Sequence, residues 1–337
     1  MKYRFATILA AGLALCGPAQ AGATFDAIKA RGQLVCGVSE GTPGITMPNQ
    51  KGEWTGLYVD LCRAVAAALV GDAAKVKFVP HSTVQRFVAL QSGEVDMVAR
   101  TATATALREA QLGLRFAPVG FYDGQAVMVQ KSSGITSVKA MDGATICVQP
   151  GSTSELNLAD YFRGLKLSFK PVTVESLPAL EAAYLAGRCD AVSNDASVLA
   201  GLKLGTARPD DHVILPERLS KEPTALVVRK GDDELFDLVR WAMFALIEAE
   251  ELGVTKANAE EQLKSTNPPV RRLLGTEPGV GAALKVDDRW AWRMIAQLGN
   301  YGEIFERNLG QQSEHKLPRG LNDLWTRGGL MYAWPVR

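Results

Sequence analysis

The sequence predicts an α/β protein built from two similar lobes. Its 337 residues are enough for two domains, and apolar strand-like runs alternate with segments of helical periodicity. One pattern also occurs twice, over residues 90–98 and 185–192: a helix, a glycine, an acidic residue and an apolar strand. Open α/β sheets bind ligands beyond the carboxyl ends of their strands, so the residues that follow each repeat are candidates for a binding site.

The first 21 residues form a predicted signal peptide. A basic start at Lys2 and Arg4 precedes an apolar core over residues 5–15 and an Ala-Gln-Ala cleavage site over residues 19–21. The apolar core is too short to span a bilayer. We therefore expect cleavage after this segment, loss of Cys16 with it, and a soluble protein in the periplasm.

The charge balance argues against nucleic-acid binding. The chain carries 37 basic and 36 acidic residues, and removal of the signal peptide changes its formal charge from +1 to −1. A dominant nucleic-acid-binding role needs a basic face, which this balance does not favour. We expect no nucleic-acid partner, and we expect a monomer.

Four cysteines remain after the signal peptide, and an even number in an exported chain indicates disulfides. Their order favours the pairs Cys36–Cys62 and Cys147–Cys189, one in each half of the early chain. A zinc site is the alternative, but no two cysteines are spaced as Cys-x-x-Cys and the chain has only three histidines. We expect two disulfides, no metal and no other cofactor.

The first lobe is expected to begin with a strand over residues 34–38 and a glycine-rich loop. Apolar residues at helical spacing from 60 to 69 predict a helix. A second strand over 76–79 and a second helix ending at Gly93 precede the first repeat's strand, 96–99.

The segment after that strand carries the main candidate binding residues. Thr101, Thr103 and Thr105 alternate beyond the strand end. Thr105 can cap a following helix, which places Arg108 in the first turn. A cation there opposes the helix dipole, so we expect Arg108 to have a partner outside the helix, and a carboxylate fits its paired donors. The alternative is a solvated arginine beside threonines that satisfy a turn.

A similar half of the chain begins near the predicted strand 146–148. Ser152 and Glu155 after it have the spacing of a capping box. The free N–H groups of such a helix start can bind an anion, although the box can also serve only to cap the helix. The second repeat ends in the strand 189–193, and Asp195 stands just past it, where a ligand would lie.

The remaining chain is predicted to return to the first lobe. A strand over 224–229 and an amphipathic helix from residue 232 precede a tail from 267 to 337 that is rich in Gly, Trp and Tyr. The tail is expected to wrap on the first lobe, with its aromatics serving packing more than ligand stacking. The chain contains no P-loop and no dinucleotide-binding fingerprint.

These features resemble the periplasmic solute-binding proteins of amino-acid ABC transporters, and within them the longer, general L-amino-acid-binding subgroup. The resemblance covers nearly all of the chain after the signal peptide. The stretches that carry it are residues 57–68, 90–96, 155–163, 249–255 and 299–329.

The resemblance implies a two-lobed type II fold with two hinge strands and an extended C-terminal tail. Lobe 1 is then discontinuous and includes the tail. The implied boundaries are a signal peptide over 1–21, lobe 1 over 22–122 plus 224–337, lobe 2 over 128–216, and hinge strands near 121–130 and 215–228.

The family pattern also implies roles for individual residues. Arg108 would hold the α-carboxylate of a free L-amino acid, helped by Thr103 and by backbone at Thr101. Thr153 and the N–H groups around Ser152 would close on that carboxylate from the other lobe. Asp195 would bind the α-ammonium group, so that each end of the zwitterion meets the opposite charge.

Some positions depart from the family pattern. Thr42 and Thr83 stand where shorter relatives often carry aromatic residues, and Ala104 stands where close relatives carry tryptophan. Arg100 adds a cation nearby. We therefore expect broad recognition of L-amino acids, with polar or acidic side chains bound at least as well as aromatic ones.

The favoured function is a receptor that traps a free L-amino acid and delivers it to an inner-membrane ABC permease. The alternative is a periplasmic enzyme on the same fold, such as a dehydratase, with Asp195 and His81 as its acid–base candidates. A ligand-sensing partner of a membrane sensor is a third possibility. The receptor is favoured because the predicted site lacks further catalytic partners.

Overall fold

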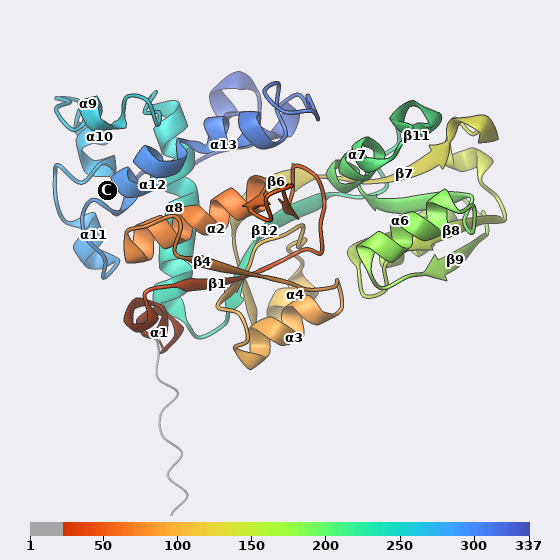
Figure 1. The fold of residues 1–337 in the computed structure, drawn as a ribbon, viewed down its shortest axis with the longest axis horizontal. Helices are drawn as coiled ribbons and strands as arrows, with labels where there is room; N and C mark the ends of the chain where they lie inside the picture. The colour runs from red at the N-terminus through yellow and green to blue at the C-terminus, as the bar shows by residue number, and fades with distance from the viewer. Residues whose placement is uncertain (1–22) are drawn as a thin grey trace, which may run out of the picture.

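The structure is a computed structural model, and it describes residues 23–337. The signal peptide predicted over residues 1–21 lies outside the described residues. Two lobes are seen, each built around its own five-stranded sheet (Figure 1). The prediction of a two-lobed α/β fold is therefore confirmed. No helix within residues 23–337 is both long and apolar enough to cross a membrane.

The sheet of lobe 1 has the strand order β4-β1-β5-β12-β6. Its first three strands are parallel, whereas β12 runs antiparallel to both of its neighbours. The parallel strands bring their carboxyl ends to one edge, where the residues that follow them can meet. The strands are β1 (Leu34–Val38), β4 (Val76–Pro80), β5 (Met97–Val98), β6 (Leu114–Asp123) and β12 (Glu222–Arg229).

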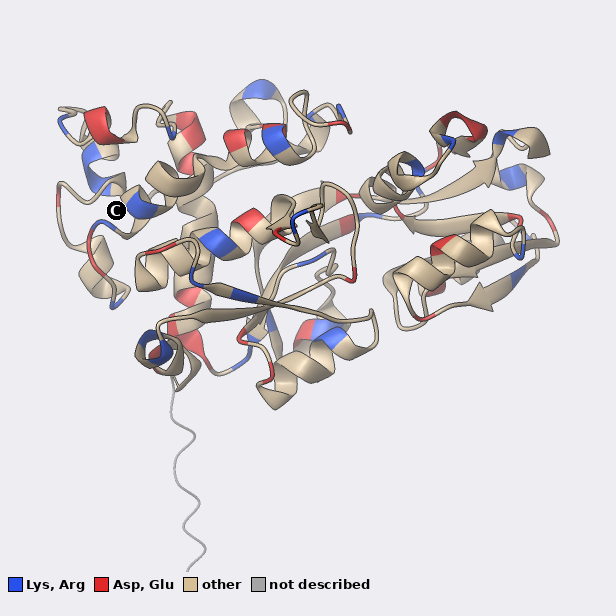
Figure 2. Cartoon of the chain, in the orientation of Figure 1, with Lys and Arg blue, Asp and Glu red and all other residues tan. Residues whose placement is uncertain are grey.

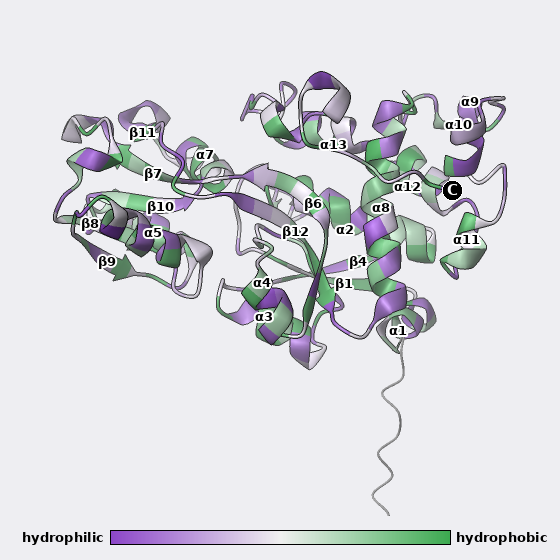
Figure 3. Cartoon of the chain, turned by 180° about the vertical axis from the view of Figure 1, so that it is seen from behind, coloured by the Kyte–Doolittle hydropathy of each residue, from purple (hydrophilic) through white to green (hydrophobic). Residues whose placement is uncertain are grey.

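Helices cover both faces of this sheet (Figure 1). Side chains alternate along a strand, so in β12 Leu226 and Val228 join one core and Val227 joins the other. The larger core contains α2 (Leu57–Val70) and α8 (Asp233–Glu251), and the smaller contains α3 (Gln85–Ser92). Helix α8 is amphipathic, with hydrophilic residues along its outer side (Figure 3).

The sheet of lobe 2 has the strand order β11-β7-β10-β8-β9. Its strands are β7 (Gln125–Gln130), β8 (Ala144–Val148), β9 (Phe169–Thr173), β10 (Ala191–Asp195) and β11 (His212–Ile214). One face packs against α5 (Thr153–Gly164), and the other packs against α6 (Leu177–Leu185) and α7 (Ala196–Gly205). Both faces are thus covered, as in the first sheet.

The chain connects the two sheets twice. It leaves lobe 1 at Gly124, between β6 and β7, and it returns over residues 215–221, between β11 and β12. Basic and acidic residues are interspersed over the helices of both lobes (Figure 2).

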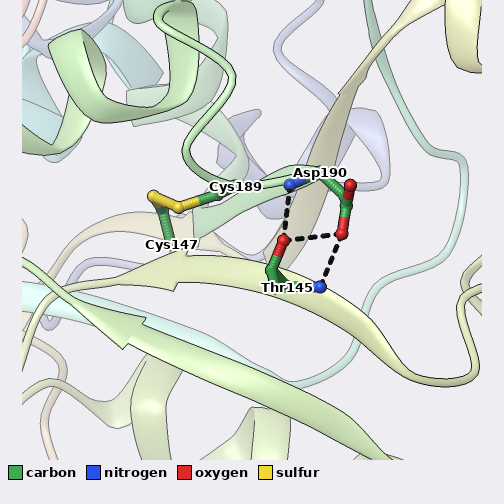
Figure 4. The surroundings of a disulfide bond; sticks show 4 residues. All are labelled: Thr145, Cys147, Cys189 and Asp190. Carbon is green, nitrogen blue, oxygen red and sulfur yellow. Dashed lines mark hydrogen bonds between the residues drawn. A yellow bond between two sulfur atoms is a disulfide. The ribbon is translucent and has the colours of Figure 1, made fainter.

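The repeated sequence pattern has the same structural role in both lobes. Asp96 accepts a hydrogen bond from the Val35 backbone N–H at 2.7 Å, before β5. Asp190 accepts one from the Thr145 backbone N–H at 2.7 Å, before β10 (Figure 4). Each carboxylate therefore ties the start of one strand to its parallel neighbour.

Both predicted disulfides are present. Cys36–Cys62 joins β1 to α2 in lobe 1, and Cys147–Cys189 joins β8 to the segment before β10 in lobe 2 (Figure 4). They close loops with sequence separations of 26 and 42 residues. In the chain-entropy model each such loop stabilises its lobe by about 3–4 kcal/mol.

The tail packs on lobe 1. Trp290 and Tyr301 are fully buried, as expected for packing aromatics, whereas Trp325 and Trp334 are about half exposed. The remaining helices and short strands are α1 (Ala23–Arg31), β2 (Met47–Pro48), β3 (Trp54–Thr55), α4 (Ala106–Gln111), α9 (Ala259–Gln262), α10 (Pro268–Leu273), α11 (Val280–Ala283), α12 (Trp290–Leu298) and α13 (Tyr301–Asn308).

Two polar contacts attach the end of the tail to lobe 1. Arg319 donates to both oxygens of Glu250 on α8, at 3.1 and 3.0 Å, and Arg327 also pairs with Glu250. Asn322 accepts from the N–H of Tyr122 and donates to its carbonyl, at 2.6 and 3.1 Å. The second contact reaches β6 immediately before the chain crosses to lobe 2.

Arg319→Ala should lower the free energy of unfolding by about 3 kcal/mol, because it leaves a buried carboxylate with one partner fewer. The side chains of Arg319 and Glu250 are only 12% and 9% exposed. Chemical denaturation would measure the change. The matched control is Arg163→Ala, whose pair with Asp160 is 77% and 72% exposed and should contribute about 0.5 kcal/mol or less. Equal effects of the two changes would contradict this account of the tail.

Candidate functional site

A small cavity lies between the lobes. Larger hollows exist, such as one beside α2 and α13. The smaller cavity is the candidate site because buried charges of both signs converge on it. Its lining residues are Thr83, Arg86, Arg100, Thr101, Thr103, Gln149, Ser152, Thr153, Ser154, Asn194 and Asp195.

Seven of the nine predicted ligand-binding residues line this cavity. Each follows a strand or, in the case of Asp195, is the last residue of one, so the two sheets bring them together from distant parts of the chain. They are Thr83, Arg100, Thr101 and Thr103 from lobe 1, and Ser152, Thr153 and Asp195 from lobe 2. The other two, Arg108 and Thr42, are not among the lining residues.

Arg108 lies directly behind the cavity wall. Its Nη1 donates to the carbonyl of Thr103 at 2.8 Å, and its guanidinium lies 5.3 Å from the ring centroid of Phe87. Thr105 caps α4 as predicted, by accepting from the Arg108 N–H at 3.2 Å. Burial lowers the pKa of Arg108, whereas Glu222 and Asp195 raise it.

Thr42 belongs to a contact between the lobes. It is fully buried, and its Cγ2 would lie 2.8 Å from a Cβ atom on Gly201 of α7. Its place is therefore against lobe 2, where only a glycine leaves room for it.

Arg86 lines the cavity but was not among the residues predicted to bind the ligand. It is 3% exposed, its guanidinium lies 4.5 Å from the ring centroid of Phe87, and its Nη1 donates to the carbonyl of Thr83. Burial lowers its pKa well below the usual value, and Arg100 and Arg108 lower it further. The sequence did contain a signal for a buried arginine here, because Arg86 and Leu90 are four residues apart and share the buried face of α3.

Arg100 is held by two hydrogen bonds from its guanidinium. Nη1 donates to the carbonyl of His81 at 2.7 Å and Nη2 donates to the Thr83 hydroxyl at 3.1 Å. Burial lowers the pKa of Arg100 to about 10, so it stays charged at neutral pH. Arg86, Arg100 and Arg108 thus make the lobe 1 side of the site positive.

Asp195 supplies the opposite charge from lobe 2. It is the last residue of β10 and is 4% exposed. Burial raises its pKa well above the usual value, Asp123 and Glu222 raise it further, and Arg86 and Arg108 oppose this rise. The site therefore combines a cationic wall from one lobe with a carboxylate from the other.

Three further lining residues were also not predicted. Gln149 donates to the carbonyl of Glu175 at 2.9 Å, and Asn194 donates to the Gln149 side chain at 3.5 Å. Ser154 completes the wall at the start of α5. Their sequence signal is only that they adjoin predicted site residues.

The lobes touch each other around the cavity. The Ser82 hydroxyl donates to Glu175 at 2.9 Å, and the Leu177 N–H donates to Glu40 at 2.9 Å. The hydroxyls of Thr103 and Thr153 lie 3.3 Å apart. These contacts enclose the site and shield its charges from water.

Of the two acid–base candidates of the enzyme alternative, only Asp195 lines the cavity. His81, an acid–base candidate of the enzyme alternative, pairs with Glu94 at 3.1 Å and does not line the cavity. Within residues 23–337 no group of three or more His, Cys, Asp or Glu residues is placed to hold a metal ion.

The fold and the site define a two-lobed protein with a small, charged cavity between its lobes. The chain belongs to the bacterial extracellular solute-binding proteins, family 3, whose model matches residues 34–257. This membership confirms the family predicted from the sequence and the periplasmic location.

Two relatives are similar over almost their whole length. A general L-amino acid-binding periplasmic protein of Rhizobium johnstonii is 49% identical over 100% of this chain and 99% of its own. A glutamate/glutamine/aspartate/asparagine-binding protein of Rhodobacter capsulatus is 48% identical over 96% of each chain. Both are named as binding proteins, and this chain is accordingly a binding protein rather than an enzyme.

A solved structure is also similar. It is an ABC transporter periplasmic binding protein of Brucella ovis with glutathione bound, 52% identical, with a TM-score of 0.91 over 93% of this chain and 99% of that one. The similarity extends over both lobes and the tail.

Gly201→Ala should hinder closure of the lobes without destabilising them. Alanine is favoured over glycine inside a helix by about 1 kcal/mol, but its Cβ would lie 2.8 Å from Thr42 Cγ2 and 3.0 Å from the Pro43 carbonyl oxygen. Overpacking costs about 1–3 kcal/mol, or roughly fivefold to a hundredfold in the closure equilibrium.

The measurements are thermal melting and small-angle X-ray scattering with solute present. We expect an unchanged or higher melting temperature and a larger radius of gyration. The control is Gly205→Ala in the same helix, where the nearest atom is 3.9 Å away. If Gly201→Ala closes like the wild type, Gly201 does not limit closure.

Proposed function

We propose that the cavity binds free L-amino acids and that the protein delivers them to an inner-membrane ABC permease. The observation that carries this proposal is the convergence of Asp195 from lobe 2 with Arg86 and Arg100 from lobe 1 on one small cavity. A zwitterion needs both signs of charge on either side of a small space, and the arginines can bind carboxylates through paired donors.

In this proposal the α-carboxylate lies toward Arg108 and the start of α5. Nη1 of Arg108 is used by Thr103, but guanidinium has five N–H donors, so others remain. The N–H groups at the start of α5 favour an anion as well. The α-ammonium group then lies at Asp195, which is buried and needs a positive partner.

We further propose that the site prefers acidic or amide side chains while accepting others. Arg86 and Arg100 remain as cations beyond the pair needed for the zwitterion. The Rhodobacter relative's name, which lists two acidic amino acids and their amides, supports this preference. The name of the Rhizobium relative supports breadth.

A second candidate ligand is glutathione, because the Brucella protein was solved with it bound. The γ-glutamyl end of glutathione carries a free α-amino and a free α-carboxyl group. The same charged groups could therefore bind it, provided that the lobes close less tightly around its longer chain.

We propose that the passages at Gly124 and over 215–221 are the hinge, that the chain between them forms lobe 2, and that the protein acts as a monomer. Each lobe has its own sheet, core and disulfide, which supports motion of the lobes as rigid bodies. The permease would then recognise the closed form, in which both lobes present a single surface.

A thermal-shift screen of the proteinogenic amino acids and glutathione tests the ligand class. A ligand at a hundred times its dissociation constant should stabilise the protein by about 2.7 kcal/mol. Stabilisation by glutamate, glutamine, aspartate or asparagine supports the proposal. Exclusive stabilisation by an aromatic amino acid would contradict the proposed preference.

Arg108→Ala and Asp195→Ala should each weaken binding without unfolding the protein. Loss of one partner from a buried charge pair costs about 2–5 kcal/mol, or roughly thirtyfold to several-thousandfold in affinity. Arg108→Lys should restore binding only in part, because lysine lacks the two-pronged geometry. Calorimetric titration and melting curves of the three variants measure these effects, and near-normal affinity in Arg108→Ala would exclude the proposed carboxylate site.

The affinity for L-glutamine should fall as the pH is lowered, starting above the usual titration range of aspartate near pH 4. The reason is that Asp195 has a raised pKa, and once protonated it no longer attracts the ammonium group. The slope should approach about tenfold per pH unit. Asp195→Asn should bind weakly at every pH. A wild-type affinity that stays constant down to pH 4 would argue against ammonium binding at Asp195.

A further inference from the structure

Glu222 is a buried carboxylate that lies beside the site, and it has no role in the binding of the zwitterion proposed so far. It is the first residue of β12, where the chain re-enters lobe 1, and it is fully buried. Burial of a carboxylate requires hydrogen-bond donors around it. The identity of those donors indicates what Glu222 does.

The two carboxylate oxygens of Glu222 face different groups. Oε2 accepts from the hydroxyls of Thr103 and Thr153, the latter at 2.8 Å. Oε1 accepts from the amide of Asn157, at 2.8 Å, and from the hydroxyl of Ser220. Only the Oε2 side is directed at residues that line the cavity.

These hydrogen bonds determine whether the two threonine hydroxyls act as donors or as acceptors toward the cavity. A hydroxyl has one hydrogen to donate and two lone pairs. Because Thr103 and Thr153 donate their hydrogens to Glu222, each can present only lone pairs to the cavity. An ammonium group is a donor only, whereas a carboxylate is an acceptor only. Hydroxyls held in this way favour an ammonium group and disfavour a carboxylate.

We infer that Glu222 is a positioning residue that holds the Thr103 and Thr153 hydroxyls as acceptors for the α-ammonium group of the ligand. Together with Asp195, the two hydroxyls select solutes that carry an amine. The inference rests on the proposed amino-acid-binding function. It also differs from the role implied by the family resemblance, which placed both threonines on the α-carboxylate. The α-carboxylate is instead left to the Arg108 guanidinium and to the backbone N–H groups at the start of α5, and of the two threonines only the hydroxyls face the ammonium group.

A simpler role for Glu222 would be a latch between the lobes. Thr103 belongs to lobe 1, and Thr153 and Asn157 belong to lobe 2, so its bonds join the lobes in either case. The two roles differ in what they predict for Asn157, which bonds to Glu222 but does not line the cavity. A latch depends on Asn157, whereas the orientation of the threonines does not.

Calorimetric titration with L-glutamate distinguishes these roles. Wild-type protein is measured first, and its failure to bind L-glutamate, L-glutamine, L-aspartate or L-asparagine would count against the proposed function itself. If another of the four binds better, it replaces L-glutamate as the probe. The inference about Glu222 is then tested only by differences among variants with that probe.

The variants form a double-mutant cycle of Glu222→Met and Thr103→Val. Each should weaken binding by about tenfold or more, because Thr103→Val removes one oriented acceptor for a charged donor and Glu222→Met releases both threonine hydroxyls. If Glu222 acts through Thr103, the double variant should bind within about threefold of Glu222→Met. Multiplication of the two losses, to roughly a hundredfold, would overturn the inference.

Asn157→Leu is the matched control, since it removes a Glu222 bond on the Oε1 side. It should change affinity by less than about threefold, within the scatter expected of an uncoupled site. A loss equal to that of Glu222→Met would identify Glu222 as a latch and overturn its positioning role. If Glu222→Met does not fold, Glu222→Asp replaces it in the cycle, because it keeps the charge but withdraws the carboxylate from the hydroxyls.

Discussion

The burial of unlike charges between two lobes is the constraint on which this structure depends. Arg86, Arg100 and Arg108 are each at most 9% exposed, and buried cations are costly unless carboxylates or carbonyls face them. Carbonyls of lobe 1 satisfy part of each guanidinium. Asp195 of lobe 2 compensates all three arginines, and Glu40 and Glu222 of lobe 1 also compensate Arg100 and Arg108, respectively. The electrostatic balance of the site is therefore complete only when the lobes are together.

The rest of the fold keeps each lobe rigid while leaving the lobes separable. Helices cover both faces of each sheet. Each lobe also has one disulfide, which joins β1 to α2 in lobe 1 and β8 to the segment before β10 in lobe 2. The tail adds to this rigidity on one side only, because its charged anchor at Glu250 and its contact with Tyr122 both belong to lobe 1. Only two short passages of chain connect the two sheets.

Much of the site was predictable because its residues follow strand ends in a repeated pattern. Thr105 and Asp195 were found in this way, since a cap and a strand end are local features. Arg86 and Glu222 were not found. Arg86 gives only the local signal that it shares a buried helix face with Leu90, and Glu222 begins a strand instead of following one. The partners Thr103 and Thr153 that reveal the role of Glu222 are far away in the sequence, so no local pattern contains them.

The sequence by itself determined the elements, their two-lobed grouping and the pairing of its cysteines, because helical periodicity, caps and strand ends act over a few residues and the repeat marks the lobes. The tertiary structure decided which charges meet. It set Thr42 against Gly201 and Arg108 behind Thr103, and it brought Thr103 and Thr153 to the same carboxylate of Glu222. Hydrogen-bond polarity and burial depend on distances between segments that are far apart in the sequence, such as Thr103 and Glu222 at a separation of 119 residues. Those distances exist only once the two sheets have formed and lie against each other.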